Sequence, residues 1–182
     1  MSIKPWKILS SEYLIQDRWM TMRADRCELP NGVVLDKYYV RENPDFVQIV
    51  PINAEGQILI VRQYRHGPQV ISTEIPGGLV DAGEDPVDAA KRELLEETGC
   101  VADRFEAVSP LYSNPARNTN QAHTFIAHNA RIVQPPQQED TEHIEFEFVS
   151  REEVFKLIDA GEFAHALHVA SLFLALRRLD NQ

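Results

Sequence analysis

The chain has 182 residues, 43% of them hydrophobic, and a formal net charge of −10. This composition supports a folded core and excludes a disordered chain, while the acidic balance argues against a nucleic acid partner, whose phosphates it would repel. No apolar run approaches the ~20 residues of a membrane helix, and the N-terminus lacks a secretory signal. We therefore expect no membrane partner and a cytoplasmic location, with Cys27 and Cys100 as reduced thiols.

Residues 1–45 are expected to form a small antiparallel β appendage. The apolar runs at 27–29 and 33–35 flank Pro30-Asn31-Gly32, and Asn-Gly between apolar runs is a hairpin signal. Residues 37–41 are predicted to form another strand. Because so thin a sheet is unstable alone, it must dock on the main domain or on a second subunit.

Residues 46–182 are expected to form the main domain. It begins with two β-branched runs, at 46–50 and 57–61, which predict strands. A helix is predicted from Pro86 to Thr98, because Asp85 can cap its start and Gly99 can close its end.

The rest of the main domain is predicted to mix strands and helices without a regular βαβ alternation. Strands are expected near 105–111, 123–127 and 144–149, and helices at 150–161, behind a capping box, and at 162–179. This order indicates an α/β fold with a mixed sheet covered by helices.

The predicted helix at 86–98 carries an apolar and an acidic stripe. Val87, Ala90 and Leu94 recur at helical spacing on one side. The acidic stripe consists of Glu93, Glu96 and Glu97. Like charges at this spacing destabilise a helix by roughly 0.2–0.5 kcal/mol per pair. A solvated face is one interpretation, and the other is a bound divalent cation, since Mg²⁺ prefers oxygen ligands.

The loop before this helix favours the metal interpretation. Gly77 and Gly78 let the backbone approach a ligand closely, because no Cβ intervenes. Glu84 adds a carboxylate just before the helix. A glycine loop that leads into a helix N-terminus also suits phosphate oxygens.

Gly78, Glu84 and the run from Arg92 to Cys100 together resemble the signature box of the Nudix hydrolases. Every polar and glycine position of that box is present at its spacing. Cys100 is the one departure, where the family has a larger aliphatic residue, and cysteine behaves as a small hydrophobe. The resemblance implies a Nudix α/β/α sandwich with a mixed sheet.

The resemblance also implies residue roles. Glu93, Glu96 and Glu97 would ligate the metal, Mg²⁺ or alternatively Mn²⁺, together with the carbonyl of Gly77. Arg92 would hold the carboxylates by salt bridges, so it joins Glu96 among the expected catalytic residues. Glu84 would be an outer carboxylate.

Shorter matches resemble one branch of this family, the ADP-ribose and nucleotide-sugar pyrophosphatases. They are residues 74–79, the marker proline position at Pro115, and the segment from Glu142 to Glu152. The N-terminal strands resemble that branch's dimerisation region, which implies a homodimer. The expected reaction is hydrolysis of a nucleoside diphosphate sugar, ADP-ribose to AMP and ribose 5-phosphate.

The expected chemistry needs a general base and groups that hold an anionic substrate. Glu142, on a polar acidic loop, is the predicted base, with Asp140 and Glu139 as alternatives. The other interpretation is an ordinary solvated loop whose carboxylates have no catalytic role. The predicted substrate-binding residues are Arg41, Arg62, Arg65, Glu74, Pro115 and Arg117. Each arginine could instead be an ordinary surface charge.

Three other functions compete with this prediction. Another Nudix chemistry would act on dinucleoside polyphosphates, nucleoside triphosphates or capped RNA. A non-catalytic regulator would only bind a nucleotide sugar, and a dimerisation protein would leave the acidic stripe unexplained. His165 and His168 lack a third ligand and are expected to be structural.

Overall fold

The structure is a computed structural model that describes residues 2–138 and 143–181. The chain divides into two compact units, Met1–Pro44 with Tyr112–Gln121, and Asp45–Leu111 with Ala122–Gln182. The segment at 112–121, which the sequence analysis assigns to the main domain, groups with the N-terminal residues.

The smaller unit is built on an antiparallel sheet in the order β1-β2-β3, formed by Lys7–Gln16, Thr21–Glu28 and Val34–Glu42. The predicted hairpin between β2 and β3 is confirmed, and Gly32 takes the positive φ of 83° that its turn requires. Residues 33–35 and 37–41 do not form separate strands, because β3 runs almost continuously through both. The third strand is β1, which the sequence analysis missed.

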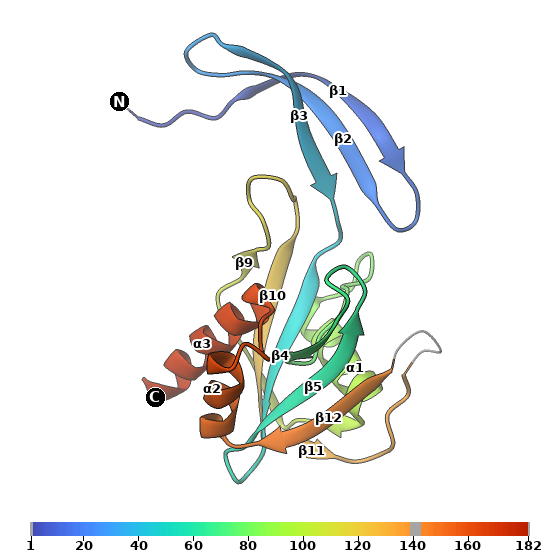
Figure 1. Ribbon diagram of the computed structural model, residues 1–182, viewed down its shortest axis with the longest axis vertical. Helices are drawn as coiled ribbons and strands as arrows, with labels where there is room; N and C mark the ends of the chain where they lie inside the picture. The colour runs from blue at the N-terminus through green and yellow to red at the C-terminus, as the bar shows by residue number, and fades with distance from the viewer. Residues whose placement is uncertain (1, 139–142, 182) are drawn as a thin grey trace. The chain divides into compact units, whose positions relative to one another are not determined.

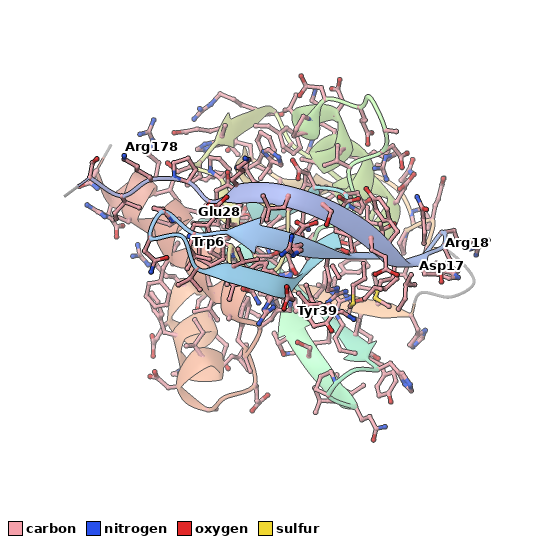
Figure 2. All side chains as sticks on the ribbon, turned by 90° about the horizontal axis from the view of Figure 1, so that it is seen from above. Trp6, Asp17, Arg18, Glu28, Tyr39 and Arg178 are labelled. Atoms are coloured by element: carbon pink, nitrogen blue, oxygen red, sulfur yellow. The ribbon has the colours of Figure 1, made fainter. Side chains whose placement is uncertain are left out.

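This sheet buries few side chains. Every residue of β1 is exposed, and the buried residues of the unit include Ala24, Asp25 and Cys27. In Figure 2, Asp17 and Arg18 lie at the β1–β2 turn, while Trp6 and Glu28 lie at the opposite end of the sheet. The unit therefore presents apolar side chains such as Ile8 and Leu14 to solvent.

The larger unit contains the remaining elements of the chain. Its strands are β4 (Phe46–Ile52), β5 (Ile58–Arg65), β6 (Val70–Glu74), β7 (Cys100–Val101), β8 (Arg104–Ala107), β10 (Gln121–His128), β11 (Arg131–Ile132) and β12 (Ile144–Val149), and its helices are α1 (Pro86–Thr98), α2 (Arg151–Asp159) and α3 (Ala166–Asp180); β9 (Leu111–Tyr112) is where the chain passes into the smaller unit.

The main sheet of this unit follows the order β12-β5-β4-β10-β8, with β6 beside β5. Strand β10 runs parallel to β4, and the other pairings on this path are antiparallel. Strand β7 pairs separately with β11. The predicted mixed sheet is confirmed.

Helices cover both faces of this sheet. Along β5, Ile58 and Ile60 pack in a cluster with α2 and α3, whereas Leu59 and Val61 pack in a second cluster with α1. This alternation follows from the two-residue side-chain period of a strand. Figure 1 shows α2 and α3 on one side of the sheet and α1 on the other. The predicted α/β/α sandwich is therefore confirmed.

The C-terminal helices differ in how well they were predicted. Helix α2 begins at the expected capping box, where the Ser150 side chain accepts from the N–H of Glu153 at 3.1 Å. Helix α3 begins at Ala166 and not at the predicted residue 162. The residues before it cap the C-terminal end of α2, where the N–H of buried Phe163 donates to the carbonyl of Leu157 at 3.1 Å. No helix among the described residues is long and apolar enough to cross a membrane.

Candidate active site

Helix α1 forms where its local signals predict it. The Asp85 side chain accepts from the N–H of Val87 at 2.9 Å, Pro86 occupies the first turn, and Gly99 ends the helix at a φ of 68°. The helix buries Ala89, Ala90 and Leu94 against the sheet. Packing this face fixes the rotation of the helix and therefore the direction of its glutamates.

Arg92 ties the acidic residues of the site together. Its Nε and Nη2 donate to the two Glu84 oxygens at 3.0 and 2.9 Å. Its Nη1 donates to Glu93 at 2.8 Å and to Glu96 at 3.2 Å. The Glu84 hydrogen bonds contribute most to a raised pKa of Arg92, and in return they lower the pKa of Glu84. The predicted bridging role of Arg92 matches these contacts.

The glycine loop, Gly77 and Gly78, lies close to two glutamates of α1, Glu93 and Glu97. The N–H of Gly77 donates to Glu97 Oε2 at 3.0 Å, and the Glu97 side chain is buried, with only 3% of its surface exposed. A Cβ on Gly78 would lie 2.2 Å from Cδ of Glu93, so the Glu93 carboxylate occupies the space that a side chain would need. Glycine is therefore required at position 78 as long as Glu93 keeps this place.

Strand β4 holds the same loop from its other side. The N–H groups of Val47 and Ile49 donate to the carbonyls of Gly78 and Pro76, each at 2.8 Å. A Cβ on Gly77 would meet the Val47 carbonyl oxygen at 2.1 Å. The loop is therefore fixed between the sheet and α1, with Gly77 beside Glu97.

The donor chemistry of this cluster fits a hard divalent cation. Glu84, Glu93 and Glu96 contact the Arg92 guanidinium, and Glu97 accepts from the N–H of Gly77, so carboxylates outnumber this guanidinium and every acidic donor is an oxygen. Among the described residues, no three acidic, histidine or cysteine side chains converge as a formed metal site.

The two arginines predicted on β5 are engaged in ion pairs. Arg62 pairs with Glu147 of β12, and both side chains are partly exposed. Arg65 contacts the two Glu74 oxygens at 3.0 and 2.5 Å. The Glu74 side chain has no exposed surface, so the expected direct contact with substrate is not available to it in this arrangement.

Three other predicted substrate-binding residues, Arg41, Pro115 and Arg117, lie in the smaller unit. The N–H of Arg41 donates to the carbonyl of Arg117 at 2.7 Å, and the carbonyl of Arg41 accepts from the N–H of Thr119 at 3.1 Å. The Arg117 guanidinium lies 5.1 Å from the centroid of the Tyr38 ring. The segment at 112–121 is thus held along β3, which the sequence did not indicate.

Glu142 and its alternatives Glu139 and Asp140 lie outside the described residues. The residue before them, Gln138, has contacts that the sequence analysis missed. Its Nε2 donates to the carbonyls of Glu97 and Ile144 at 3.0 and 2.8 Å, and its Oε1 accepts from the N–H of Ile144 at 3.1 Å. Gln138 therefore joins the end of α1 to the start of β12. An amide in a polar segment gives no sequence signal for such a contact.

Comparisons with known proteins bear on both units. Residues 43–170 match the NUDIX domain, and residues 6–40 match the nucleoside diphosphate sugar hydrolase N-terminal domain. An ADP-ribose pyrophosphatase of Bacillus subtilis strain 168 is 28% identical over 86% of this chain and 84% of its own length. The ADP compounds hydrolase NudE of Escherichia coli strain K12 is 26% identical over 100% of this chain and 97% of its own length.

A solved structure extends the similarity to the whole fold. The crystal structure of an ADP compounds hydrolase superposes with a TM-score of 0.87 at 26% identity, and covers 100% of this chain and 98% of that one. The family match spans most of the chain and includes the glycine loop, Arg92 and the glutamates of α1. The chain therefore belongs to the Nudix hydrolase family.

Proposed function

We propose that the protein hydrolyses the pyrophosphate linkage of a nucleoside diphosphate sugar, with ADP-ribose as the preferred substrate and AMP and ribose 5-phosphate as products. The relatives named for ADP-ribose and for ADP compounds support this choice. The match of residues 6–40 to the N-terminal domain of nucleoside diphosphate sugar hydrolases supports it independently of the Nudix box.

A divalent cation, Mg²⁺ or alternatively Mn²⁺, would be held by Glu93, Glu96, Glu97 and the carbonyl of Gly77. When bound, it would neutralise phosphate charge and acidify the attacking water. Arg92 would keep Glu93 and Glu96 in place, as its hydrogen bonds to both carboxylates suggest.

In the proposed reaction, a water oxygen forms a bond to one phosphorus and the bridging P–O bond breaks. Glu142 accepts the proton of the attacking water, and the bridging oxygen departs with the other phosphate. Arg41, Arg62, Arg65 and Arg117 are the proposed groups for the phosphates and sugar, with Pro115 shaping the loop that carries Arg117. Glu74 supports Arg65 rather than the substrate, because its carboxylate is fully buried.

One observation carries this proposal. The glycine loop places the N–H of Gly77 at 3.0 Å from buried Glu97, while Arg92 gathers the other three carboxylates within 3.2 Å. A purely structural acidic helix face would not need a glycine loop packed against two of its glutamates. Nor would a module that only binds nucleotides need so many carboxylates, because carboxylates repel phosphate groups.

A substrate panel tests the function. The purified protein is assayed with ADP-ribose, GDP-mannose, UDP-glucose, diadenosine polyphosphates and nucleoside triphosphates, with Mg²⁺, with Mn²⁺ and with EDTA. The proposal expects AMP and ribose 5-phosphate from ADP-ribose and no turnover in EDTA. A preference for triphosphates or dinucleoside polyphosphates would favour another Nudix chemistry. No turnover of any compound with either metal would favour the binding module.

We also propose that the protein is a homodimer that associates through the smaller unit. The support is the exposed β1 strand, with Ile8, Tyr13 and Leu14 exposed at 54%, 50% and 42%. An isolated sheet of this size needs an apolar partner for stability. Light scattering should give twice the chain mass, and Leu14→Asp should lower it to the monomer, while Leu14→Met should not. A wild-type monomer at all concentrations would refute the proposal.

A cytoplasmic location completes the proposal. Both cysteines of the sequence are buried free thiols, as expected of a protein in a reducing compartment.

A further inference from the structure

A buried polar group lies behind the glycine loop, on the face of the sheet that α3 covers. It consists of Glu74 at the end of β6 and His168 of α3, with Arg65 of β5 reaching in from the surface. Only 5% of the surface of His168 is exposed. A buried charge and a buried imidazole are expensive to maintain without partners, so their contacts call for an explanation.

The contacts of His168 define its protonation. The backbone N–H of Ile75 donates to Nδ1 at 3.3 Å, so Nδ1 is the acceptor and the ring proton is on Nε2. Nε2 lies 3.5 Å from Glu74 Oε2. Burial lowers the pKa of His168 to about 3, against the opposing effect of Glu74 and together with those of His165 and Arg65. His168 is thus a neutral imidazole that faces a carboxylate on one side and an N–H on the other.

Ile75 connects His168 to the loop that carries Gly77, a proposed metal ligand. It is buried and begins the loop whose next residues contact β4 and α1. Pro76 is held by Ile49, and Gly77 donates to Glu97. His168 satisfies an N–H that would otherwise be buried without a partner, and it does so two residues before Gly77.

We propose that His168 is a positioning residue: by accepting from Ile75 and facing the Glu74–Arg65 ion pair, it holds the glycine loop so that Gly77 stays beside Glu97. This inference rests on the proposed function and assigns that site a support on α3. Outer partners of metal ligands typically affect metal affinity or activity by about 10- to 100-fold.

Three variants test the inference. His168→Leu removes both polar contacts. His168→Asn places an amide oxygen near the position of Nδ1 and can still accept from Ile75. Thr124→Val is the control, because it removes a buried hydroxyl on the same face of the sheet, one that donates to Ser171 and not to the loop.

The readouts are Mn²⁺ affinity by calorimetry without substrate, kcat and KM for ADP-ribose, and the free energy of unfolding. His168→Leu is expected to weaken Mn²⁺ binding and lower kcat by about tenfold or more, with a smaller change in KM, and His168→Asn should recover most of both. Thr124→Val should lower stability but leave Mn²⁺ affinity and kcat within about twofold.

Two results would overturn the inference. One is a His168→Leu protein that is less stable but keeps wild-type Mn²⁺ affinity and kcat. The other is a His168→Asn protein no better than His168→Leu. If the wild type binds Mn²⁺ but hydrolyses none of the compounds in the panel, the proposed function fails, while the affinity comparison still tests His168.

Discussion

The two units of the molecule differ in how they hold their predicted functional residues. In the larger unit, helices cover both faces of the sheet, and the glycine loop lies between β4 and α1. In the smaller unit, β1 is exposed along its whole length, and the segment with Pro115 and Arg117 is held along β3 by backbone hydrogen bonds.

This difference suggests that the larger unit carries the chemistry and the smaller unit contributes to binding and association. Rigid, packed elements suit groups that must keep a fixed geometry during chemistry. Exposed strands and loops suit binding and association, which depend on surface. We therefore expect changes in the larger unit to alter kcat and stability, and changes in the smaller unit to alter KM and association.

The largest expected effect tests the chemistry assigned to the larger unit. Glu142→Gln keeps the size of the side chain but removes the proposed base, so kcat for ADP-ribose should fall by ~10²–10⁴. Asp140→Asn and Glu139→Gln are matched controls at neighbouring acidic positions in the sequence and should lose much less. If Glu142→Gln loses tenfold or less, the base lies elsewhere.

Stability gives the next contrast. Leu94 of α1 is fully buried against the sheet, so Leu94→Ala should lower the free energy of unfolding by roughly 2–5 kcal/mol. Ile8→Ala on exposed β1 should change it by less than about 0.5 kcal/mol at concentrations where the chain is monomeric. Urea unfolding of both variants measures this. Equal losses would contradict the difference between the units.

A binding effect is expected from the smaller unit. Arg117→Ala removes a proposed charged contact to substrate and should raise KM for ADP-ribose by about 10- to 100-fold, with little change in kcat. Arg26→Ala is the control, because Arg26 is an exposed arginine that pairs with exposed Asp36 on the same sheet. A fall in kcat without a change in KM would place Arg117 in the chemistry instead.

The smallest effect concerns pH and His168. Its pKa is lowered to about 3 in the fold from 6.5, so below pH 6.5 the unfolded chain binds a proton that the native state does not. Native stability should therefore fall on acidification, by up to about 1.4 kcal/mol per pH unit from this group. Between pH 7 and 5, the free energy of unfolding should depend less steeply on pH for His168→Asn than for the wild type. Equal dependence on pH in the two proteins would contradict the burial of a neutral imidazole.

The sequence predicted best what local chemistry determines. Helix α1 was predicted from Pro86 to Thr98 because Asp85, Pro86 and Gly99 act within a few residues of its ends. The acidic cluster followed from its spacing on that helix. Strand β12 was likewise marked by its own residues, at 144–149.

The features that were missed depend on partners far away in the chain. The sequence analysis expects a structural role for His168 but does not identify its contact with Ile75, because the two residues lie 93 positions apart. Strand β1 lacks a clear buried alternation, since all its residues are exposed. Glu74 resembled a substrate contact because only the fold shows that Arg65 and His168 enclose its carboxylate.

Calorimetric titration of Mg²⁺ and Mn²⁺ into the wild type and into the double variant Glu96→Ala/Glu97→Ala, followed by ADP-ribose turnover on the same samples, tests the central claim most directly. The account predicts saturable uptake by the wild type, no such uptake by the double variant, and a turnover reduced at least about 100-fold. A wild type that takes up neither ion, or a double variant with intact turnover, would contradict it.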